Sequence, residues 1–163
     1  MDEINPAHLR KVMGHFATGI TVITWASPDE PIGMTANAFM SVSMNPALAL
    51  ISVRNESHFN YAMPKGGRFG VNFLSKDQQE ISSHFGGKPQ KSIEIDYLDH
   101  AGTPLINSSL AHVVCRVVDI HPAGDHLLYI GELEHLQLGE QENPLIFYRG
   151  SYQQLQPCQL EVR

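Results

Sequence analysis

The chain has 163 residues, which suits one domain with a substantial core, and we expect a single domain over residues 1–163. Its formal net charge is −6 and its Lys and Arg residues form no run, which argues against nucleic acid or an anionic membrane as the main partner. No apolar run approaches the roughly 20 residues of a membrane span, and the charged N-terminus does not resemble a signal peptide. Cys115 and Cys158 lack metal-ligand spacing and indicate reduced thiols, so a soluble cytoplasmic protein is expected.

The first half of the chain predicts one short helix and several strands. Asn5 can cap the helix and Pro6 suits its first position, and apolar residues then recur at helical spacing until Gly19. Strands are predicted at residues 20–25, 39–43 and 48–53 because these runs are rich in β-branched and apolar residues.

The second half predicts two further short helices and most of the strand structure. Ser57 can cap a helix through Met63, and Ser75 or Asp77 can cap another that reaches Phe85. The predicted strands are residues 69–74, 110–121, 126–138 and 145–148, with a turn at residues 122–125. Six or seven strands with few helices favour an antiparallel barrel, because a parallel sheet needs regular strand–helix alternation.

Several familiar kinds of site are not supported. The chain has neither GxGxxG after a strand nor GxxxxGK[ST], so a Rossmann site and a P-loop are not predicted. The nine histidines show no metal-ligand spacing, and we predict no metal site. No Ser/His/Asp order or pair of carboxylates stands out. A bound cofactor would therefore have to bring the reactivity.

Residues 33–57 have the composition of a pocket for a flat, phosphorylated ligand. Thr35, Ala36, Asn37 and Ala38 are small enough for a planar ring to lie against their main chain. A phosphate needs several donors and preferably one positive charge. These could come from the end of the next strand, where it opens into a helix, namely from Ser52, Arg54, Asn55 and Ser57.

Other polar residues have two readings each. His126 follows a Gly-Asp turn and could contact a ligand, or it could be a solvated residue of an ordinary hairpin. Asn72 lies in an apolar strand, where it either faces a ligand or forms internal hydrogen bonds. The end of the second-half helix, with Ser82, His84 and Phe85, could cover a ring or simply pack on the barrel. The aromatic and cationic residues Tyr148, Arg149 and Tyr152 could belong to a dimer surface.

A series of short motifs recurs in a specific order along nearly the whole chain. They are FATGITVIT from Phe16, GMTANAF from Gly33, SVS from Ser41, Pro46, ISVR from Ile51, FGVNFL from Phe69, GTPL from Gly102, and GDH from Gly124 followed by IGEL. On these motifs the chain resembles the flavin reductase family of FMN-binding split barrels, the reductase component of two-component flavin monooxygenases.

The resemblance implies a mainly β fold, a six-stranded antiparallel split β-barrel of Greek-key type with a few short peripheral α-helices. It also implies a homodimer with FMN, or FAD, in a groove near the subunit interface. NADH or NADPH would be the co-substrate. The reduced flavin would then diffuse to a partner flavin-dependent monooxygenase.

The resemblance also implies roles for individual residues. Residues Thr35 to Asn37, with Met34, would meet the isoalloxazine and ribityl groups, and Ser52, Val53, Arg54 and Ser57 the ribityl and phosphate groups. His126 would lie beside the nicotinamide. The remaining cofactor-binding residues would be Asn72, Ser82, His84, Phe85 and Tyr152.

Three other functions stay open on the sequence. The nearest is a non-enzymatic FMN-binding protein on the same fold that passes electrons to a partner. An oxidase of a phosphorylated vitamin would need a second phosphate site rich in Arg and Lys, and the chain has only 11 such residues. A metal-binding β-barrel is the third.

Overall fold

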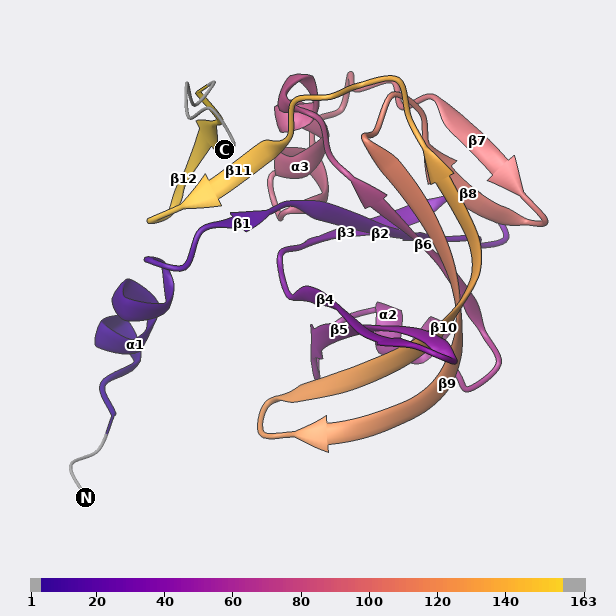
Figure 1. The fold of residues 1–163 in the computed structure, drawn as a ribbon, viewed down its shortest axis with the longest axis horizontal. Helices are drawn as coiled ribbons and strands as arrows, with labels where there is room; N and C mark the ends of the chain where they lie inside the picture. Colours follow the sequence, from indigo (N-terminus) through magenta and orange to yellow (C-terminus); the bar gives the residue numbers. More distant parts are fainter. Residues whose placement is uncertain (1–3, 157–163) are drawn as a thin grey trace, which may run out of the picture.

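The computed structural model describes residues 4–156. Antiparallel β-structure dominates these residues, with three short α-helices and one 3-10 helix (Figure 1). The helices are α1 (Pro6–Met13), α2 (Phe59–Ala62), η1 (Lys76–Gln78) and α3 (Gln79–Phe85). The strands are β1 (Thr18–Gly19), β2 (Thr21–Trp25), β3 (Ile32–Ala36), β4 (Phe39–Met44), β5 (Ala47–Arg54), β6 (Arg68–Phe73), β7 (Tyr97–His100), β8 (Thr103–Ile106), β9 (Ala111–Ala123), β10 (His126–Leu138), β11 (Leu145–Tyr148) and β12 (Ser151–Gln154).

Seven of the strands form one strongly curved sheet in the order β3-β2-β6-β9-β10-β5-β4. The long hairpin of β9 and β10 lies at its centre and connects the β3-β2-β6 part with the β5-β4 part, as Figure 1 shows. β1 pairs with the β11-β12 hairpin in a second sheet, and β7 pairs with β8 in a third. β3 and β4 are the edges of the large sheet, so the described strands form no closed barrel.

Apolar strand residues fill the inside of the curved sheet. All five residues of β2 are buried, which agrees with their position between β3 and β6. Phe59 of α2 lies at the centre of an aromatic cluster, with its ring edge-on to Trp25, Phe69 and Tyr129 at centroid distances of 4.9 to 5.6 Å. The burial of such side chains is the main stabilising contribution to the fold.

The N-terminal helix is confirmed at its start and is shorter than predicted. Asn5 caps it, because its side-chain oxygen accepts hydrogen bonds from the N–H groups of Ala7 and His8. The helix ends at Met13 rather than near Gly19, and residues 18–19 form β1 instead. None of its residues is buried, and Figure 1 shows α1 projecting away from the rest of the molecule.

The mainly β, antiparallel class is confirmed, but the structure contains more strands than predicted. Five of the twelve strands were not expected: β1, β3, β7, β8 and β12. Of the two predicted caps for the helix that reaches Phe85, Ser75 and Asp77, it is Ser75 that forms a capping box, at the start of η1. No helix within the described part of the chain has both the length and the apolar character needed to cross a membrane.

Candidate functional site

The edge strand β3 forms one side of a pocket that we call the edge pocket. β3 pairs with β2 alone, so the other side of its main chain has no strand partner in the described sheet. The pocket has a volume of about 440 Å³, within the usual range for small-molecule sites. It is lined by Met34, Thr35, Ala36, Asn37, Ala38, Ser52, Val53, Arg54, Ser57, Phe85, Gly86 and His126.

A second cavity, which we call the hairpin pocket, adjoins the edge pocket. The two cavities share Thr35, Asn37, Arg54 and Gly86, and the hairpin pocket has a volume of about 520 Å³. Its other lining residues are one residue that directly precedes β2 and residues of α3, the loop after it and the β11-β12 hairpin. They are Ile20, Ser82, Ser83, Lys88, Phe147, Gly150 and Tyr152.

Hydrogen bonds hold the walls of the two pockets together. The Thr35 hydroxyl donates to the carbonyl of Ser82 at 2.7 Å, which ties β3 to α3. The Tyr152 hydroxyl lies 2.9 Å from Oγ of Ser82 and 3.2 Å from Oγ of Ser83, which ties β12 to the same helix. Three separate elements therefore form one connected wall.

Phe85 reaches the edge pocket because residue 33 is a glycine. A Cβ added at Gly33 would lie 3.0 Å from two ring carbons of Phe85, closer than an ordinary contact. With a Cβ at this position the ring would have to shift by a few tenths of an ångström, so the glycine allows its present close contact with β3. The glycine of the GMTANAF motif thus allows an aromatic side chain to pack beside the small residues of β3.

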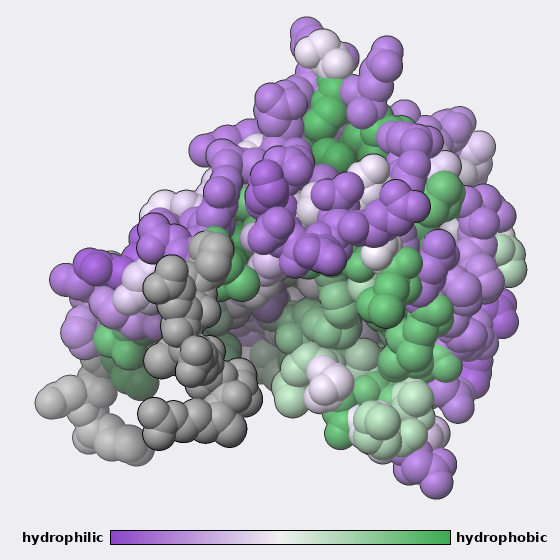
Figure 2. All heavy atoms as spheres, turned by 45° about the horizontal axis from the view of Figure 1, so that its top comes forward, coloured by the Kyte–Doolittle hydropathy of each residue, from purple (hydrophilic) through white to green (hydrophobic). Residues whose placement is uncertain are grey.

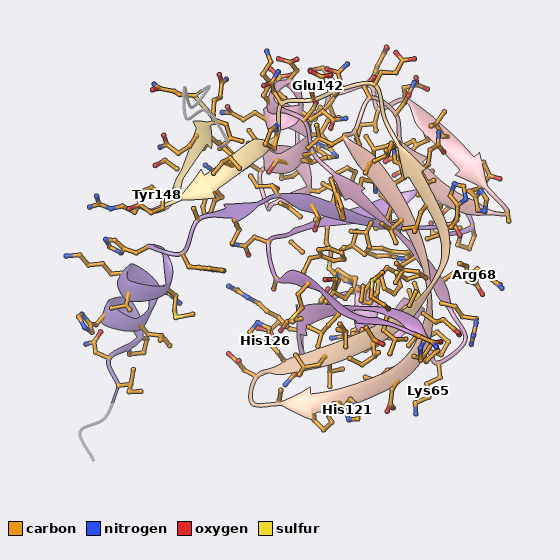
Figure 3. The ribbon with its side chains drawn as sticks, in the orientation of Figure 1. Lys65, Arg68, His121, His126, Glu142 and Tyr148 are labelled. Carbon is orange, nitrogen blue, oxygen red and sulfur yellow. The ribbon has the colours of Figure 1, made fainter. Side chains whose placement is uncertain are left out.

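The other side of the edge pocket carries a cation and an imidazole. Arg54 ends β5 and His126 begins β10, and the two residues are register partners across these strands. Nδ1 of His126 lies 2.6 Å from a carboxylate oxygen of Asp125, and this hydrogen bond lowers the pKa of Asp125. Figure 3 shows His126 on the side of the sheet that faces α1.

Two side chains in these pockets can bind an anion. The guanidinium of Arg54 and the ammonium of Lys88 are exposed, and neither forms an ion pair with a carboxylate of residues 4–156. Ser57 lies beside Arg54 and adds a hydroxyl. Small residues along an unpaired strand edge, together with these donors, fit a flat ring with a phosphorylated tail.

Most of the predicted site residues lie together. Met34, Thr35, Ala36, Asn37, Ser52, Val53, Arg54, Ser57, Phe85 and His126 line the edge pocket, and Ser82 and Tyr152 line the hairpin pocket. The Val53 side chain is buried in the core, so this residue borders the pocket through its main chain. His84 lies elsewhere, in a neighbouring cavity on the far side of Gly33 and Phe85.

Asn72 is not brought to either pocket, contrary to the prediction that it lines the groove. Its side chain is 0% exposed, and its amide donates to the carbonyl of Val22 and to Oγ1 of Thr24 at 2.9 and 3.0 Å. Its side-chain oxygen accepts from the N–H of Ile106 at 2.7 Å. Asn72 therefore connects β6 to β2 and β8, which is the internal hydrogen-bonding role that the sequence left open.

Some lining residues had not been chosen from the sequence. Gly86 and Lys88 follow α3, and Phe147 and Gly150 belong to the terminal hairpin. The lysines of the loop after residue 86 were the one sequence feature that could have indicated Lys88 as a pocket residue. Among the described residues, no group of three or more His, Cys, Asp or Glu side chains could hold a metal ion.

Known proteins resemble this chain over most of its length. The family model of the flavin reductase like domain matches residues 13–156. The chain is 40% identical over 157 residues to an NADH-dependent flavin reductase of Rhodococcus sp, with 94% of this chain and 89% of that protein covered. It is 38% identical over 159 residues to HsaB of Mycobacterium tuberculosis, the reductase subunit of a flavin-dependent monooxygenase, with 95% and 85% covered.

A solved structure supports the same assignment. The flavin reductase PheA2 in its native state superposes with a TM-score of 0.89 at 40% sequence identity, covering 94% of this chain and 100% of that chain. The fold and these similarities define a class of β-protein that reduces flavins. This chain belongs to the flavin reductase family.

Proposed function

We propose that this protein is an NAD(P)H:flavin oxidoreductase that reduces FMN, or FAD, and supplies the reduced flavin to a partner flavin-dependent monooxygenase. The single observation that carries the proposal is the edge pocket, in which an unpaired strand edge of small residues lies opposite the cation Arg54. The relatives named above, an NADH-dependent flavin reductase and a monooxygenase reductase subunit, support the same activity and co-substrate.

Each wall of the two pockets has a proposed task. The main chain from Thr35 to Asn37 would bind the ring edge and ribityl group, and Arg54 and Ser57 would bind the phosphate. Phe85 and Tyr152 would limit the movement of the ring and exclude water. His126 would position the nicotinamide, with its imidazole oriented by Asp125.

A bound flavin supplies the acceptor for a hydride from the reduced nicotinamide. The contribution of the protein is then mainly to hold the two rings at a reactive distance, a form of catalysis that needs no acid or base. This agrees with the edge pocket, whose lining residues include no carboxylate among the described part of the chain.

The alternative is a non-enzymatic protein that keeps FMN bound and transfers electrons, and the named relatives do not favour it. Anaerobic oxidation of NADH and of NADPH, followed with FMN or FAD in large excess over protein, tests the proposal. We expect many turnovers per protein molecule. Oxidation that stops after one equivalent of NADH would show that the flavin is retained rather than released.

The proposed working form is a homodimer, and exposed hydrophobic residues support it. Figure 2 shows hydrophobic side chains gathered on the lower part of the larger body of the molecule. Exposed hydrophobic residues occur on α1 with Phe16 after it, on β4, and near the end of β10; they are Leu9, Val12, Met13, Phe16, Met40, Val42, Met44, Leu136 and Leu138. Apolar surface of this kind marks interfaces. Sedimentation equilibrium should give twice the chain mass.

Three finer points belong to the same proposal. The seven-stranded sheet, with its unpaired edges β3 and β4, is the candidate for the split barrel. Transfer of reduced flavin by diffusion predicts that the oxygenase works when a dialysis membrane separates it from this protein. The cytoplasmic location also stays a prediction.

A further inference from the structure

A third cavity lies between the end of α1 and the turn that joins β11 to β12. It has a volume of about 330 Å³ and is lined by Arg10, Lys11, Gly14, His15, Arg149 and Gly150. We call it the basic pocket. Three of the 11 Lys and Arg residues of the chain line it, together with a histidine, although the whole protein has a net charge of −6.

The positive charges of the basic pocket are not neutralised within residues 4–156. No carboxylate lines the pocket, and Arg10, Lys11 and Arg149 form no ion pair with a described residue. Like charges placed together repel each other, and a bound anion would offset this repulsion.

A structural explanation accounts for only part of the cluster. Arg10 and Lys11 lie in the last turn of α1, where positive charge interacts favourably with the helix dipole. His15 also acts locally, since its Nδ1 lies 2.7 Å from the carbonyl of Lys11. Arg149 comes from a different element, and the helix dipole does not explain why it is held beside the other two cations.

The backbone fixes Arg149 against the end of α1. The N–H of Arg149 donates to the carbonyl of Gly14 at 2.8 Å. Arg149 and Gly150 have φ values of 52° and 80°, the positive values that a tight type I′ hairpin turn needs at both central positions. The His15 ring also meets the Tyr148 ring edge-on at 6.1 Å. The basic pocket is thus formed by two elements that are joined to each other.

The basic pocket adjoins the proposed cofactor site at Gly150. Gly150 lines both the basic pocket and the hairpin pocket, and the hairpin pocket shares Arg54 with the edge pocket. Arg54, Lys88, Arg149 and Arg10 therefore line neighbouring cavities, and none of these four cations forms an ion pair with a residue of 4–156. Neighbouring cavities that share lining residues suit an extended ligand such as a dinucleotide.

We infer that the basic pocket binds the adenosine-phosphate tail of a dinucleotide whose redox ring occupies the edge pocket. The inference rests on the proposed function and extends it to the far end of the ligand. Guanidinium groups bind phosphate oxygens in a bidentate manner, which suits Arg10 and Arg149 to this task. The tail can belong to FAD or to the nicotinamide dinucleotide, because both carry the same adenosine phosphate.

The experiment compares each dinucleotide with the mononucleotide that lacks the tail. The variants are Arg149→Asn, chosen because Asn tolerates positive φ, and Arg10→Gln. Lys65→Gln is the matched control, since it removes one charge on the opposite side of the molecule from Tyr148 (Figure 3). Flavin affinity is titrated with FAD and FMN. The KM is measured for NADH and for reduced nicotinamide mononucleotide, both with FMN.

We expect Arg149→Asn and Arg10→Gln each to weaken the binding of one dinucleotide by about 5- to 10-fold, which is the effect expected from the loss of an exposed charge-assisted phosphate contact. The affinity for FMN and the KM for the nicotinamide mononucleotide should change by less than about 2-fold, because these ligands lack the tail and salt screens the distant charge. A loss confined to FAD assigns the tail to the flavin, and one confined to NADH assigns it to the co-substrate. Arg149→Lys should restore part of the loss.

Two results would overturn the inference. One is an unchanged affinity for both dinucleotides, and the other is an equal loss for the mononucleotides, which would indicate a general effect of charge. Flavin titration does not depend on turnover. A wild-type protein that binds FAD and FMN but does not oxidise NADH would therefore contradict the proposed function and still leave the basic pocket testable.

Discussion

Arg54 and His126 lie directly opposite each other on β5 and β10, and both line the edge pocket. The N–H of Asn55 donates to the carbonyl of Asp125 at 3.0 Å, which continues the contact between the two strands past this pair. Main-chain hydrogen bonds therefore hold the backbones of the two residues side by side. Separate substitutions can show whether they serve two different ligands.

Arg54→Ala should weaken the binding of FMN and FAD but leave the affinity for riboflavin almost unchanged, because riboflavin has no phosphate. A charge-assisted hydrogen bond contributes about 1.5 to 3 kcal/mol in favourable cases, and the exposure of this guanidinium puts the expected loss near 10-fold. Fluorescence titration with the three flavins measures it. An equal change for riboflavin and FMN would remove Arg54 from the phosphate site.

His126→Ala should impair the use of NADH more than the binding of flavin. The imidazole is anchored by Asp125 at 2.6 Å, so Asp125→Asn should give a smaller defect of the same kind. Stopped-flow reduction gives the effect on NADH, and flavin titration gives the effect on the cofactor. Losses of equal size in both measurements would contradict a role at the nicotinamide.

Asn72→Ala should reduce stability rather than flavin affinity. The substitution leaves the carbonyl of Val22 and the N–H of Ile106 without their buried partner. Buried groups left unsatisfied cost about 1 to 3 kcal/mol each, so we expect a loss of about 2 to 4 kcal/mol. Urea unfolding measures it. A variant of normal stability that no longer binds flavin would instead place Asn72 in the site.

Cys115 should be unreactive in the folded protein. Burial of this thiol raises its pKa to about 12, so almost no thiolate exists near neutral pH. The test uses Cys158→Ser, because Cys158 lies outside the described residues. Ellman's reagent should label less than about one tenth of the protein at pH 8 and one thiol per chain in guanidinium. Rapid labelling of the folded variant would mean that β9 opens readily.

The central strands could be predicted from the sequence because buried strands consist of continuous runs of apolar residues. Residues 20–25, 48–53 and 69–74 contain β-branched and apolar residues that identify strands without any knowledge of their neighbours. β3 escaped prediction for the opposite reason. Ile32–Ala36 has only two strand-favouring residues, Ile32 and Thr35, and also contains a glycine. Its pairing with the fully buried β2 holds it in an extended conformation.

The same contrast holds for the site. Residues near one another in sequence, such as those of the GMTANAF motif, could be assigned to a pocket by their size and chemistry. Lys88 and Gly150 reach the pockets only because α3 and the β11-β12 hairpin pack beside β3, a relationship that composition and spacing do not contain. Asn72 illustrates the reverse error, since a polar residue in an apolar strand can serve the core alone.

The edge position of β3 has a consequence for how this site can vary among related proteins. A ligand that binds to peptide groups depends on atoms that every residue possesses, so changes of side chain at Thr35 or Ala36 need not abolish binding. Such changes would instead alter the shape and polarity of the pocket around the ligand. Natural selection could therefore adjust substrate preference at these positions while the main-chain contacts to the ligand persist.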